Sequence, residues 1–592
     1  MLLRQSSSRR CRRFCCCDSK PSAGVPTLWL SCGFATKPGS YKEYLLAKHN
    51  SRECNLASLK VEIIGRGTWL DMVARRVIER EEQLGRRLEP LRTESGLGAS
   101  GLPHIGSLGD VIRAYGVKLA LETQGRKTEF IAYSDDLDGL RKVPEGMPDS
   151  LRSFIGQPVS SVPDPYNCHQ SYALHVNSLL REAMDECGVE YVFHSATEDY
   201  REGVLIEQIR RLLASADKVG QIVKEEVGQE KFTTALPYFP ICDSCGRIYT
   251  TRAISFDAST DKLTYACDGT GEIKGQKISG CGYKGEVNIR DGRGKLPWKG
   301  EFAARWTALG INFEAYGKDI TDSVRVNDRI CQEVLGYPPP YHVRYELFLD
   351  KGGKKISKSK SALDVITPQT WFRYAPASSL ILLMFKRITG ARNVGVEDIP
   401  TFVNELNRLE EVYFGLRKLN DEKETAKLKG LYEYSYFLKP PPQPSPHVPY
   451  NLLVYLVAVS PPDKRAEYIM SKLREYGYVK ETLPPSIQQE IGYATNWAKD
   501  FQEIPETKIE ITGPQKLAIE DLITVVRKEA DERMLQNNVF NIAKRYAIEP
   551  SDFFKLLYTI LLGAPRGPRL GPYIKAMGSE NVARALERSI GK

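Results

Sequence analysis

The fold is decided by the stretch Thr93-Glu94-Ser95-Gly96-Leu97-Gly98-Ala99-Ser100-Gly101-Leu102-Pro103-His104-Ile105-Gly106-Ser107-Leu108-Gly109-Asp110-Val111. Its glycines predict a loop from Thr93 onward, and the apolar residues after it recur at helical spacing until Gly125, where the helix is expected to stop. A glycine-rich turn that opens a helix presents free backbone N–H groups, which favour phosphate. His104 stands where the helix begins, so it either contacts that phosphate or only caps the helix.

A strand is expected next, because Thr128 to Ser134 is rich in apolar and aromatic residues. Strand, turn, helix and strand make a βαβ unit, so the fold class is α/β with a parallel sheet. The strand is followed by Asp135, Asp136 and Asp138. Because ligands bind at the carboxyl ends of parallel strands, these acids either meet a cation, such as an amine or Mg²⁺, or form a solvated acidic turn.

A second motif follows about 250 residues later, in the run Lys354-Lys355-Ile356-Ser357-Lys358-Ser359-Lys360 behind two glycines. Two ammonium groups on a loop of this kind can clamp a triphosphate. Taken alone, the run would most simply be a solvated surface loop. Together with Pro103-His104-Ile105-Gly106 at a strand-to-helix turn, it predicts a nucleotide site.

Cysteines suggest a metal site in the middle of the chain. Cys242 and Cys245 form a Cys-x2-Cys pair, and Cys267 and Cys281 follow in glycine-rich turns. Four thiolates suffice for a closed tetrahedral zinc site with a structural role, although free or redox-active thiols are the alternative. The 13 cysteines of the 592 residues do not read as a disulfide scaffold and favour a reducing compartment.

The N-terminus and the overall charge add broader constraints. Residues 1–40 are rich in Arg and Ser with the single acid Asp18, which is typical of an organellar presequence, a disordered tail or a start codon assigned too early. The net charge of +9 fits a polyanionic partner. We find no apolar run near the ~20 residues that a spanning helix needs, so no membrane association is expected.

Helical patterns account for much of the remainder. We expect a surface helix over Trp69 to Glu82, helices through 171–227, and mostly helices after about residue 390. Within the last part, Leu517 to Met534 and Phe553 to Leu562 have amphipathic patterns. Arg566 and Arg569, in a rigid basic turn, either touch phosphate or cap helices.

Four segments together resemble one family. Ser100 to Gly106, Ser134 to Pro144, Tyr345 to Asp350 and Arg566 to Pro572, combined with the Lys-Ile-Ser-Lys-Ser run, are similar to the class I lysyl-tRNA synthetases of archaea and some bacteria. The resemblance extends from about Trp69 to the C-terminus. It implies a Rossmann-like catalytic domain with a small zinc-binding insert and an all-α anticodon-binding domain. The implied boundaries are an N-terminal extension over 1–60, the two catalytic halves over 61–235 and 293–385, the insert over 236–292, and the anticodon-binding domain over 386–592.

The resemblance also implies a reaction and its residues. Lysine and ATP would give lysyl-adenylate and pyrophosphate, and the lysyl group would then pass to tRNA(Lys). His104, Lys355 and Lys358 are the implied catalytic residues. The expected ATP site consists of Pro103, His104, Gly106, Ser107, Gly317, Asp319, Lys355, Ser357, Lys358 and Ser359, with Mg²⁺. The expected lysine site consists of Gly96, Gly98, Asp136, Asp138, Trp298, Glu301 and Tyr345.

Several points stay open at this stage. A lysine side chain needs an aromatic wall and a carboxylate, and Asp136, Asp138 and Glu301 are equal candidates for the carboxylate. Ser107 and Ile320 depart from the family pattern, in which Ile320 is often a histidine. The alternatives are another class I adenylate-forming ligase, for glutamate or cysteine, and a non-catalytic RNA-binding relic. We expect a monomer, in the cytoplasm or, if residues 1–40 are a presequence, in the mitochondrial matrix.

Overall fold

The structure is a computed structural model that describes residues 63–591 except 88, 145–146, 231–232, 274–275, 354–365, 461–463, 502–510, 530 and 563–568. The expected N-terminal extension, the loop with Lys355, Ser357, Lys358 and Ser359, and Arg566 therefore lie outside the described residues. Residues from Ile63 onward make one compact unit. In the part of the chain that is described, no helix combines the length and apolar character needed to cross a membrane.

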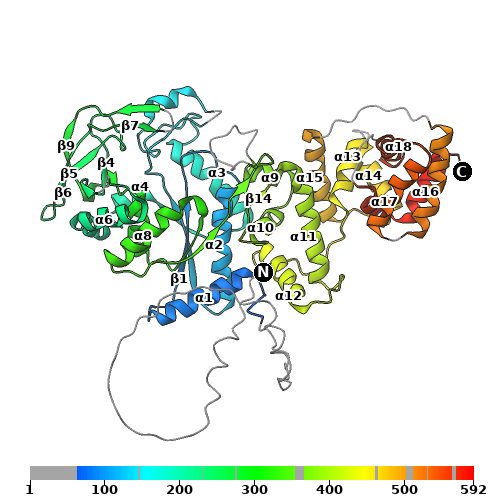
Figure 1. Cartoon of the computed structure of the whole chain (residues 1–592), viewed down its shortest axis with the longest axis horizontal. Helices are drawn as coiled ribbons and strands as arrows, with labels where there is room; N and C mark the ends of the chain where they lie inside the picture. Colours follow the sequence, from blue (N-terminus) through cyan, green and yellow to red (C-terminus); the bar gives the residue numbers. More distant parts are fainter. Residues whose placement is uncertain are drawn as a thin grey trace, which may run out of the picture. The chain divides into compact units, whose positions relative to one another are not determined.

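A five-stranded parallel sheet forms the centre of the first half (Figure 1). Its strands are β1 (Leu91–Leu97), β2 (Thr128–Ser134), β3 (Val192–Ser195), β11 (Phe313–Gly317) and β12 (Tyr341–Tyr345). The spatial order is β12-β11-β1-β2-β3, and every neighbouring pair is parallel. The prediction of a parallel α/β fold is thus confirmed. Because the chain winds outward in both directions from β1, a crevice is expected where the carboxyl ends of β1 and β11 diverge.

The decisive stretch begins as a strand. β1 runs to Leu97, with Gly96 opposite Tyr133 and Leu97 opposite Ser134 of β2. The prediction of a loop from Thr93 was therefore wrong, because pairing with β2 throughout and with β11 at Thr93 and Glu94 offsets the weak strand preference of glycine. The loop is confined to the residues between Leu97 and Ile105.

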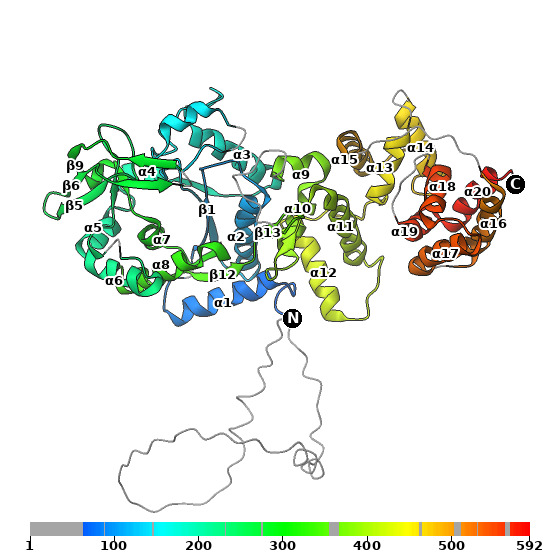
Figure 2. The ribbon, with the colours of Figure 1, turned by 45° about the horizontal axis from the view of Figure 1, so that its top comes forward.

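The predicted helix is confirmed as α2 (Ile105–Thr123), with Gly125 just past its end at φ +79°. Almost all of α2 is buried, since it packs on β1 and β2, on α1 (Trp69–Gln83) and on α10 (Ala377–Phe385), and it lies beside β1 in both views (Figures 1 and 2). Gly116 allows the close approach to α10: a Cβ there would lie 2.5 Å from the ring of Phe385. The apolar helix at the centre thus joins the sheet to the helical second half.

The region 171–227 is helical except for one strand. It contains α3 (Tyr172–Cys187), α4 (Ala196–Arg201), α5 (Ile206–Ala214) and α6 (Ala216–Val227). Val192–Ser195 instead forms β3, which extends the sheet beside β2. The all-helical prediction was wrong here because a four-residue strand is stabilised by pairing with a distant segment and leaves little local pattern.

Short antiparallel strands make up the region around the cysteines. They are β4 (Phe239–Pro240), β5 (Arg252–Asp257), β6 (Lys262–Ala266), β7 (Thr270–Ile273), β8 (Gln276–Ser279), β9 (Lys284–Asn288) and β10 (Gly294–Lys295). β5, β6 and β9 form one sheet, while β7 pairs with β8 and β4 with β10. The chain returns to the parallel sheet through α7 (Trp298–Leu309), β11 and α8 (Thr321–Glu333).

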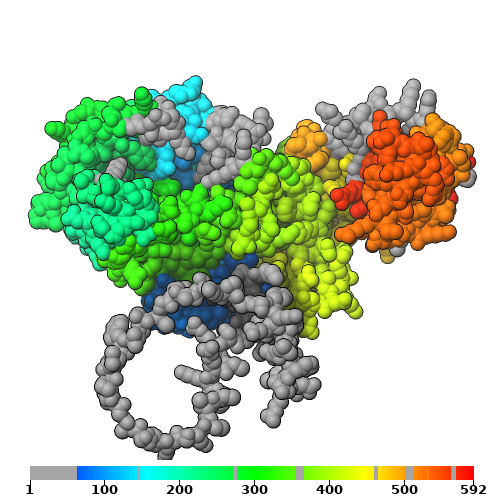
Figure 3. Space-filling view, in the orientation of Figure 1, coloured from blue at the N-terminus to red at the C-terminus, as the bar shows by residue number. Residues whose placement is uncertain are grey.

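Helices dominate the second half, as predicted; the short strands β13 (Phe348–Leu349) and β14 (Arg392–Asn393) pair in parallel at its start. The helices are α9 (Pro368–Tyr374), α11 (Ile399–Tyr413), α12 (Glu422–Ser435), α13 (Tyr450–Val459), α14 (Arg465–Glu475), α15 (Pro485–Phe501), α16 (Gly513–Lys528), α17 (Glu532–Arg545), α18 (Pro550–Leu562), α19 (Leu570–Met577) and α20 (Ser579–Ser589). From α16 on they form the orange to red part of the surface in Figure 3.

One helix prediction in this half was wrong. Leu517 to Met534 does not form a single helix, because Glu529 is extended and Asp531 caps a new helix by accepting from the N–H groups of Arg533 and Met534. Phe553 to Leu562 is confirmed within α18. Short 3-10 helices occur at Asp149–Phe154, Ile289–Asp291, Lys318–Ile320 and Val396–Asp398.

Candidate active site

A cavity of about 400 Å³ opens at the carboxyl ends of β1, β2 and β11. Its lining comes from segments far apart in the chain: the loop after β1, the start of α2, the turn after β2, and α7, β11 and β12. The strand order places a ligand crevice at this edge of the sheet. The glycine-rich loop and the acidic turn, which were predicted separately, therefore face one space.

His104 shapes the phosphate end of this cavity. It is the residue before α2, and its Nδ1 accepts a hydrogen bond from the backbone N–H of Ser107 at 3.1 Å. An Nδ1 that accepts leaves the proton of a neutral imidazole on Nε2, which makes Nε2 a donor. A Cβ at Gly106 would lie 2.8 Å from the ring, so glycine is needed there for the ring to keep its place. Helix N-terminus and imidazole together can hold a phosphate.

Asp138 and Glu301 share an internal cation. The ammonium of Lys295, of which 2 % is exposed, lies 2.6 Å from Asp138 and 2.7 Å from Glu301. Arg141 pairs with Asp138 at 3.1 Å, and the indole N–H of Trp298 donates to Asp138. Burial alone would lower the pKa of Lys295, but the two carboxylates raise it above its usual value. Lys295 therefore stays charged, and this group of residues is electrically balanced.

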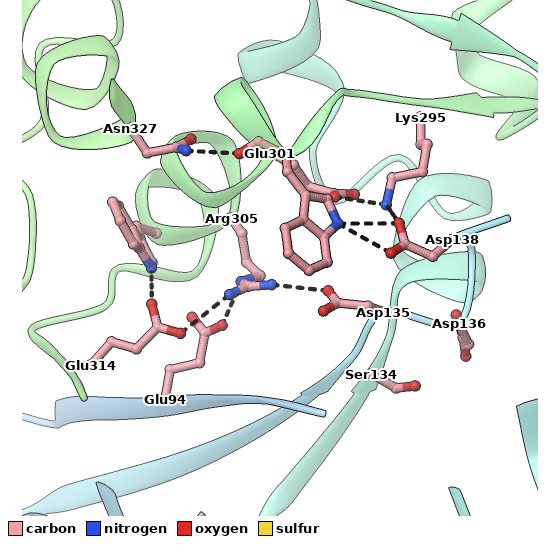
Figure 4. A network of polar contacts seen from close by, with 12 residues as sticks. Glu94, Ser134, Asp135, Asp136, Asp138, Lys295, Glu301, Arg305, Glu314 and Asn327 are labelled. Atoms are coloured by element: carbon pink, nitrogen blue, oxygen red, sulfur yellow. Dashed lines mark hydrogen bonds and ion pairs between the residues drawn. The ribbon is translucent and has the colours of Figure 1, made fainter. Parts of the chain in front are cut away.

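A second network surrounds Arg305 on α7. Its guanidinium, 1 % exposed, contacts Glu94 and lies 3.3 Å from Asp135 and 3.4 Å from Glu314 (Figure 4). It also stacks over the ring of Tyr133, with 4.5 Å from its central carbon to the ring centre. Burial raises the pKa of Asp135 to about 7 although Arg305 opposes the shift. Three carboxylates here share one cation.

Asp136 is turned away from the cavity (Figure 4). Its carboxylate accepts from the hydroxyl of Ser195 at 2.6 Å and from the backbone N–H and hydroxyl of Thr197, both at 2.8 Å. These bonds tie the end of β2 to the start of α4. The local role of Asp136 is therefore to join two elements.

The four predicted cysteines come together. The sulfur of Cys242 lies 3.6 Å from that of Cys281, and the sulfur of Cys245 lies 3.7 Å from that of Cys267. Thiolates about 2.3 Å from a tetrahedral Zn²⁺ lie about 3.8 Å from one another, so the spacing fits that ion. The cysteines do not line the cavity described above.

A second cluster of side chains that could hold a metal ion was missed from the sequence. Asp164, Cys168, His169 and His175 bring their ligand atoms within 4.8 Å of one another ahead of and on α3. The Cys168 sulfur lies 3.1 Å from Asp164, 3.2 Å from His169 Nδ1 and 3.1 Å from His175 Nδ1. The spacing Asp-x3-Cys-His-x5-His was available as a signal, since Cys, His and Asp are the ligands that zinc uses.

Comparison with known proteins identifies the family of this chain. Residues 67–437 match the model of the family described as tRNA synthetases class I (K). The chain belongs to this family. A lysine–tRNA ligase of Cenarchaeum symbiosum is 48 % identical over 523 residues, which is 88 % of this chain and 99 % of the relative. A lysine–tRNA ligase of Rickettsia bellii (strain OSU 85-389) is 31 % identical over 84 % of this chain and 93 % of the relative.

The resemblance drawn from the sequence motifs is thus confirmed, and this synthetase is an enzyme of the ligase class. Its cavity gathers ten of the predicted residues. They are Gly96, Gly98, His104, Gly106, Ser107, Asp138, Trp298, Gly317, Asp319 and Tyr345. Pro103, Asp136 and Glu301 do not line the cavity of the synthetase, and the four residues of the lysine-rich loop lie outside the described part of the chain.

The cavity of the synthetase also has a lining that the predictions omitted. Asp135, Phe302, Arg305 and Glu314 form part of it, and so do Arg113 and Ile320. Asp135 is the first residue after β2, so its position in the sequence was a usable signal. The sequence contained no signal for Arg305 or Glu314, because each is a single charged residue within a helix or strand pattern.

Proposed function

We propose that this synthetase is a lysine–tRNA ligase that activates L-lysine with ATP and transfers it to tRNA(Lys). The observation that carries the proposal is the acidic lining of the cavity, which has the six acids Asp110, Asp135, Asp138, Glu314, Asp319 and Glu346 and the four basic residues Arg113, Arg141, Lys142 and Arg305. An acidic lining suits a substrate with a cationic side chain better than a glutamate or a cysteine side chain. The high identity to lysine–tRNA ligases supports the same choice.

Positioning and charge stabilisation carry the first step. Oxygen of the lysine carboxylate attacks the α-phosphate of ATP, the bond from that phosphorus to the bridging oxygen breaks, and pyrophosphate leaves. His104 and the N-terminus of α2 hold phosphate, while Gly317, the last residue of β11, and Asp319 line the cavity for the nucleoside. Lys355 and Lys358 would close over the departing phosphates, and Mg²⁺, when bound, neutralises their charge.

Trp298 and Tyr345 provide the aromatic walls of the lysine site. Both line the cavity, Trp298 beside Asp138 and Tyr345 with its hydroxyl donated to Asp110. The guanidinium of Arg113 lies over the Tyr345 ring with 4.2 Å to its centre, which fixes the ring in place. Flat apolar faces suit the methylene stem of lysine.

The helical second half would bind the tRNA, as an anticodon-binding region. Arg569 precedes α19 and is exposed, so it can reach a phosphate group. Such contacts are electrostatic and make tRNA affinity fall with salt. We propose that the synthetase acts as a monomer.

Activation specificity tests the proposal. We expect ATP–pyrophosphate exchange with L-lysine and with no other of the twenty amino acids, followed by charging of tRNA(Lys). Exchange with glutamate or cysteine in place of lysine would contradict it. Absence of exchange with all twenty, together with tRNA binding, would instead support the non-catalytic alternative.

Metal content tests both clusters. We expect two zinc ions per chain in the purified protein, one at Cys242, Cys245, Cys267 and Cys281 and one at Asp164, Cys168, His169 and His175. Cys245→Ser and His175→Ala should each remove one ion and lower the thermal unfolding temperature, because structural zinc stabilises the folded chain directly. Elemental analysis after gel filtration gives the count. Two ions in Cys245→Ser would rule out that thiolate as a ligand.

A further inference from the structure

Two phenylalanine rings lie together on the surface of the helical second half. Phe540 belongs to α17 and Phe554 to α18, and their ring centres are 4.9 Å apart. Phe540 is 44 % exposed, whereas Phe553 and Leu557 of α18 are completely buried and fill the core below. Phe540 therefore adds little to the core and presents its ring to a partner.

The aromatic surface continues along α18. Tyr558 follows Phe554 by one helical turn, and their ring centres are 6.3 Å apart. Both residues are half-buried. We call these three side chains, Phe540, Phe554 and Tyr558, the aromatic row. Exposed flat rings of this kind stack with the bases of single-stranded nucleic acids, because every base has a π face.

The side chains around the aromatic row are polar or basic. Asn537 and Lys544 are three and four residues from Phe540, so they lie on the same side of α17, and both are exposed. Lys555 is exposed next to Phe554 on α18. None of these neighbours is acidic. Ammonium groups beside exposed rings fit a partner that has phosphates between its bases.

The position of the aromatic row limits which nucleic acid it could bind. Its residues belong to the helical second half, and none of them lines the active-site cavity. Lysine and ATP meet in that cavity, so only tRNA, among the substrates of the proposed reaction, is large enough to reach a second surface. The acceptor end of the tRNA must enter the cavity. The unpaired bases at its other end are those of the anticodon loop, and proteins commonly stack such loop bases on aromatic side chains.

We propose that unpaired anticodon-loop bases of tRNA(Lys) stack on the aromatic row, with Phe540 as the main contact and Lys544 and Lys555 at the neighbouring phosphates. The proposal rests on the proposed function and names the residues that bind this part of the tRNA. The amide of Asn537 can donate to a base carbonyl and accept from a base N–H, which are the groups on the edge of uracil. Anticodons that read the lysine codons are rich in uracil.

Phe540→Ala is the direct test, because it removes an exposed ring and leaves the core intact. We expect the Kd for tRNA(Lys) to rise about 5- to 150-fold, the effect of losing one base–aromatic stack. Phe540→Trp should restore binding, whereas Phe540→Leu, which is apolar but not aromatic, should not. Met534→Ala is a matched control, because Met534 is 50 % exposed on the same helix but about 120° around it. Thermal unfolding should be nearly the same in all these variants.

Salt dependence and base removal separate stacking from charge. Lys544→Ala should lower the slope of log Kd against log salt concentration by about 0.7 to 0.9, the contribution of one phosphate contact. Phe540→Ala should leave that slope unchanged. A tRNA(Lys) that lacks the anticodon bases but keeps its sugar–phosphate chain should bind equally well to the unaltered protein and to Phe540→Ala.

Three results would contradict these expectations. An unchanged tRNA affinity in Phe540→Ala, or the same loss of affinity for intact and base-free tRNA, would overturn the proposal. A lower sedimentation coefficient of Phe540→Ala at unchanged tRNA affinity would also overturn it, since the ring would then contact a second copy of the chain. If the unaltered protein activates an amino acid other than lysine, the proposed function itself fails, which is a separate result.

Discussion

His104→Ala is expected to slow ATP–pyrophosphate exchange by about 100- to 1,000-fold, the usual effect of removing one positioned donor from a developing negative charge. The ring lies at the N-terminus of α2 and lines the cavity. Its Nδ1 accepts a hydrogen bond from the Ser107 N–H, so in the neutral ring the proton is on Nε2. This Nε2–H can donate a hydrogen bond to a phosphate oxygen. The KM for lysine should change little, because the floor of the cavity is left intact.

A control is needed because His104 also caps a helix. Removing a cap costs about 1 kcal/mol of stability, so His104→Ala should lower the unfolding temperature slightly as well. His104→Asn retains a side chain that caps helices well but places no imidazole at the phosphate. It should therefore restore stability and leave exchange slow. Normal exchange in both variants would show that His104 has only the structural role.

The local patterns of the sequence were sufficient for the centre of the fold. α2 was predicted with its start at His104 and its stop at Gly125 because helix periodicity and capping residues are read within a few turns. β2 was predicted for the same reason. β3 was missed because its four residues are held by pairing with β2, which no short window contains.

Many residues of the site were predicted correctly, but the pairing of its charged side chains was not predicted. From residue type and order, His104, Gly106 and Asp138 were assigned to one active site, and all three line one cavity. They did not show which carboxylates are paired within the protein. The partner of Asp138 is Lys295, 157 positions along the chain, and the partner of Asp135 is Arg305. The side chain of Asp136 is directed by contacts with Ser195 and Thr197, which also come from another element.

Lys295→Met is expected to have the largest effect on stability. It leaves Asp138 and Glu301, both buried, without the ammonium that lies between them. Breaking a buried pair by removing one partner costs about 3–5 kcal/mol. Denaturant unfolding at pH 8 should show this loss, and Lys295→Met combined with Glu301→Gln should recover part of it.

The stability loss of Lys295→Met should depend on pH, because it comes from buried carboxylates. In the unaltered protein burial works to raise the pKa of Asp138, but Lys295 and Arg141 outweigh it and hold that pKa below its usual value. Without Lys295, both carboxylates are buried and short of a cation, so their pKa values in the folded state rise above those in the unfolded chain. The folded variant then binds more protons than its unfolded chain as the pH falls. Its loss of unfolding free energy relative to the unaltered protein should therefore shrink between pH 8 and pH 5. A deficit independent of pH would show that lost packing, not charge, is the cause.

The same variant tests whether Asp138 and Glu301 bind the ammonium of the substrate. If the substrate ammonium used Asp138 and Glu301, Lys295 would compete with it, and Lys295→Met would lower the KM for lysine. If the ammonium binds elsewhere in the cavity, the variant leaves its site unchanged, and the KM for lysine should not fall. Steady-state exchange kinetics at a temperature where the variant is folded distinguishes the two. A KM for lysine that does not fall would show that Asp138 and Glu301, which Lys295 already neutralises, have a structural role.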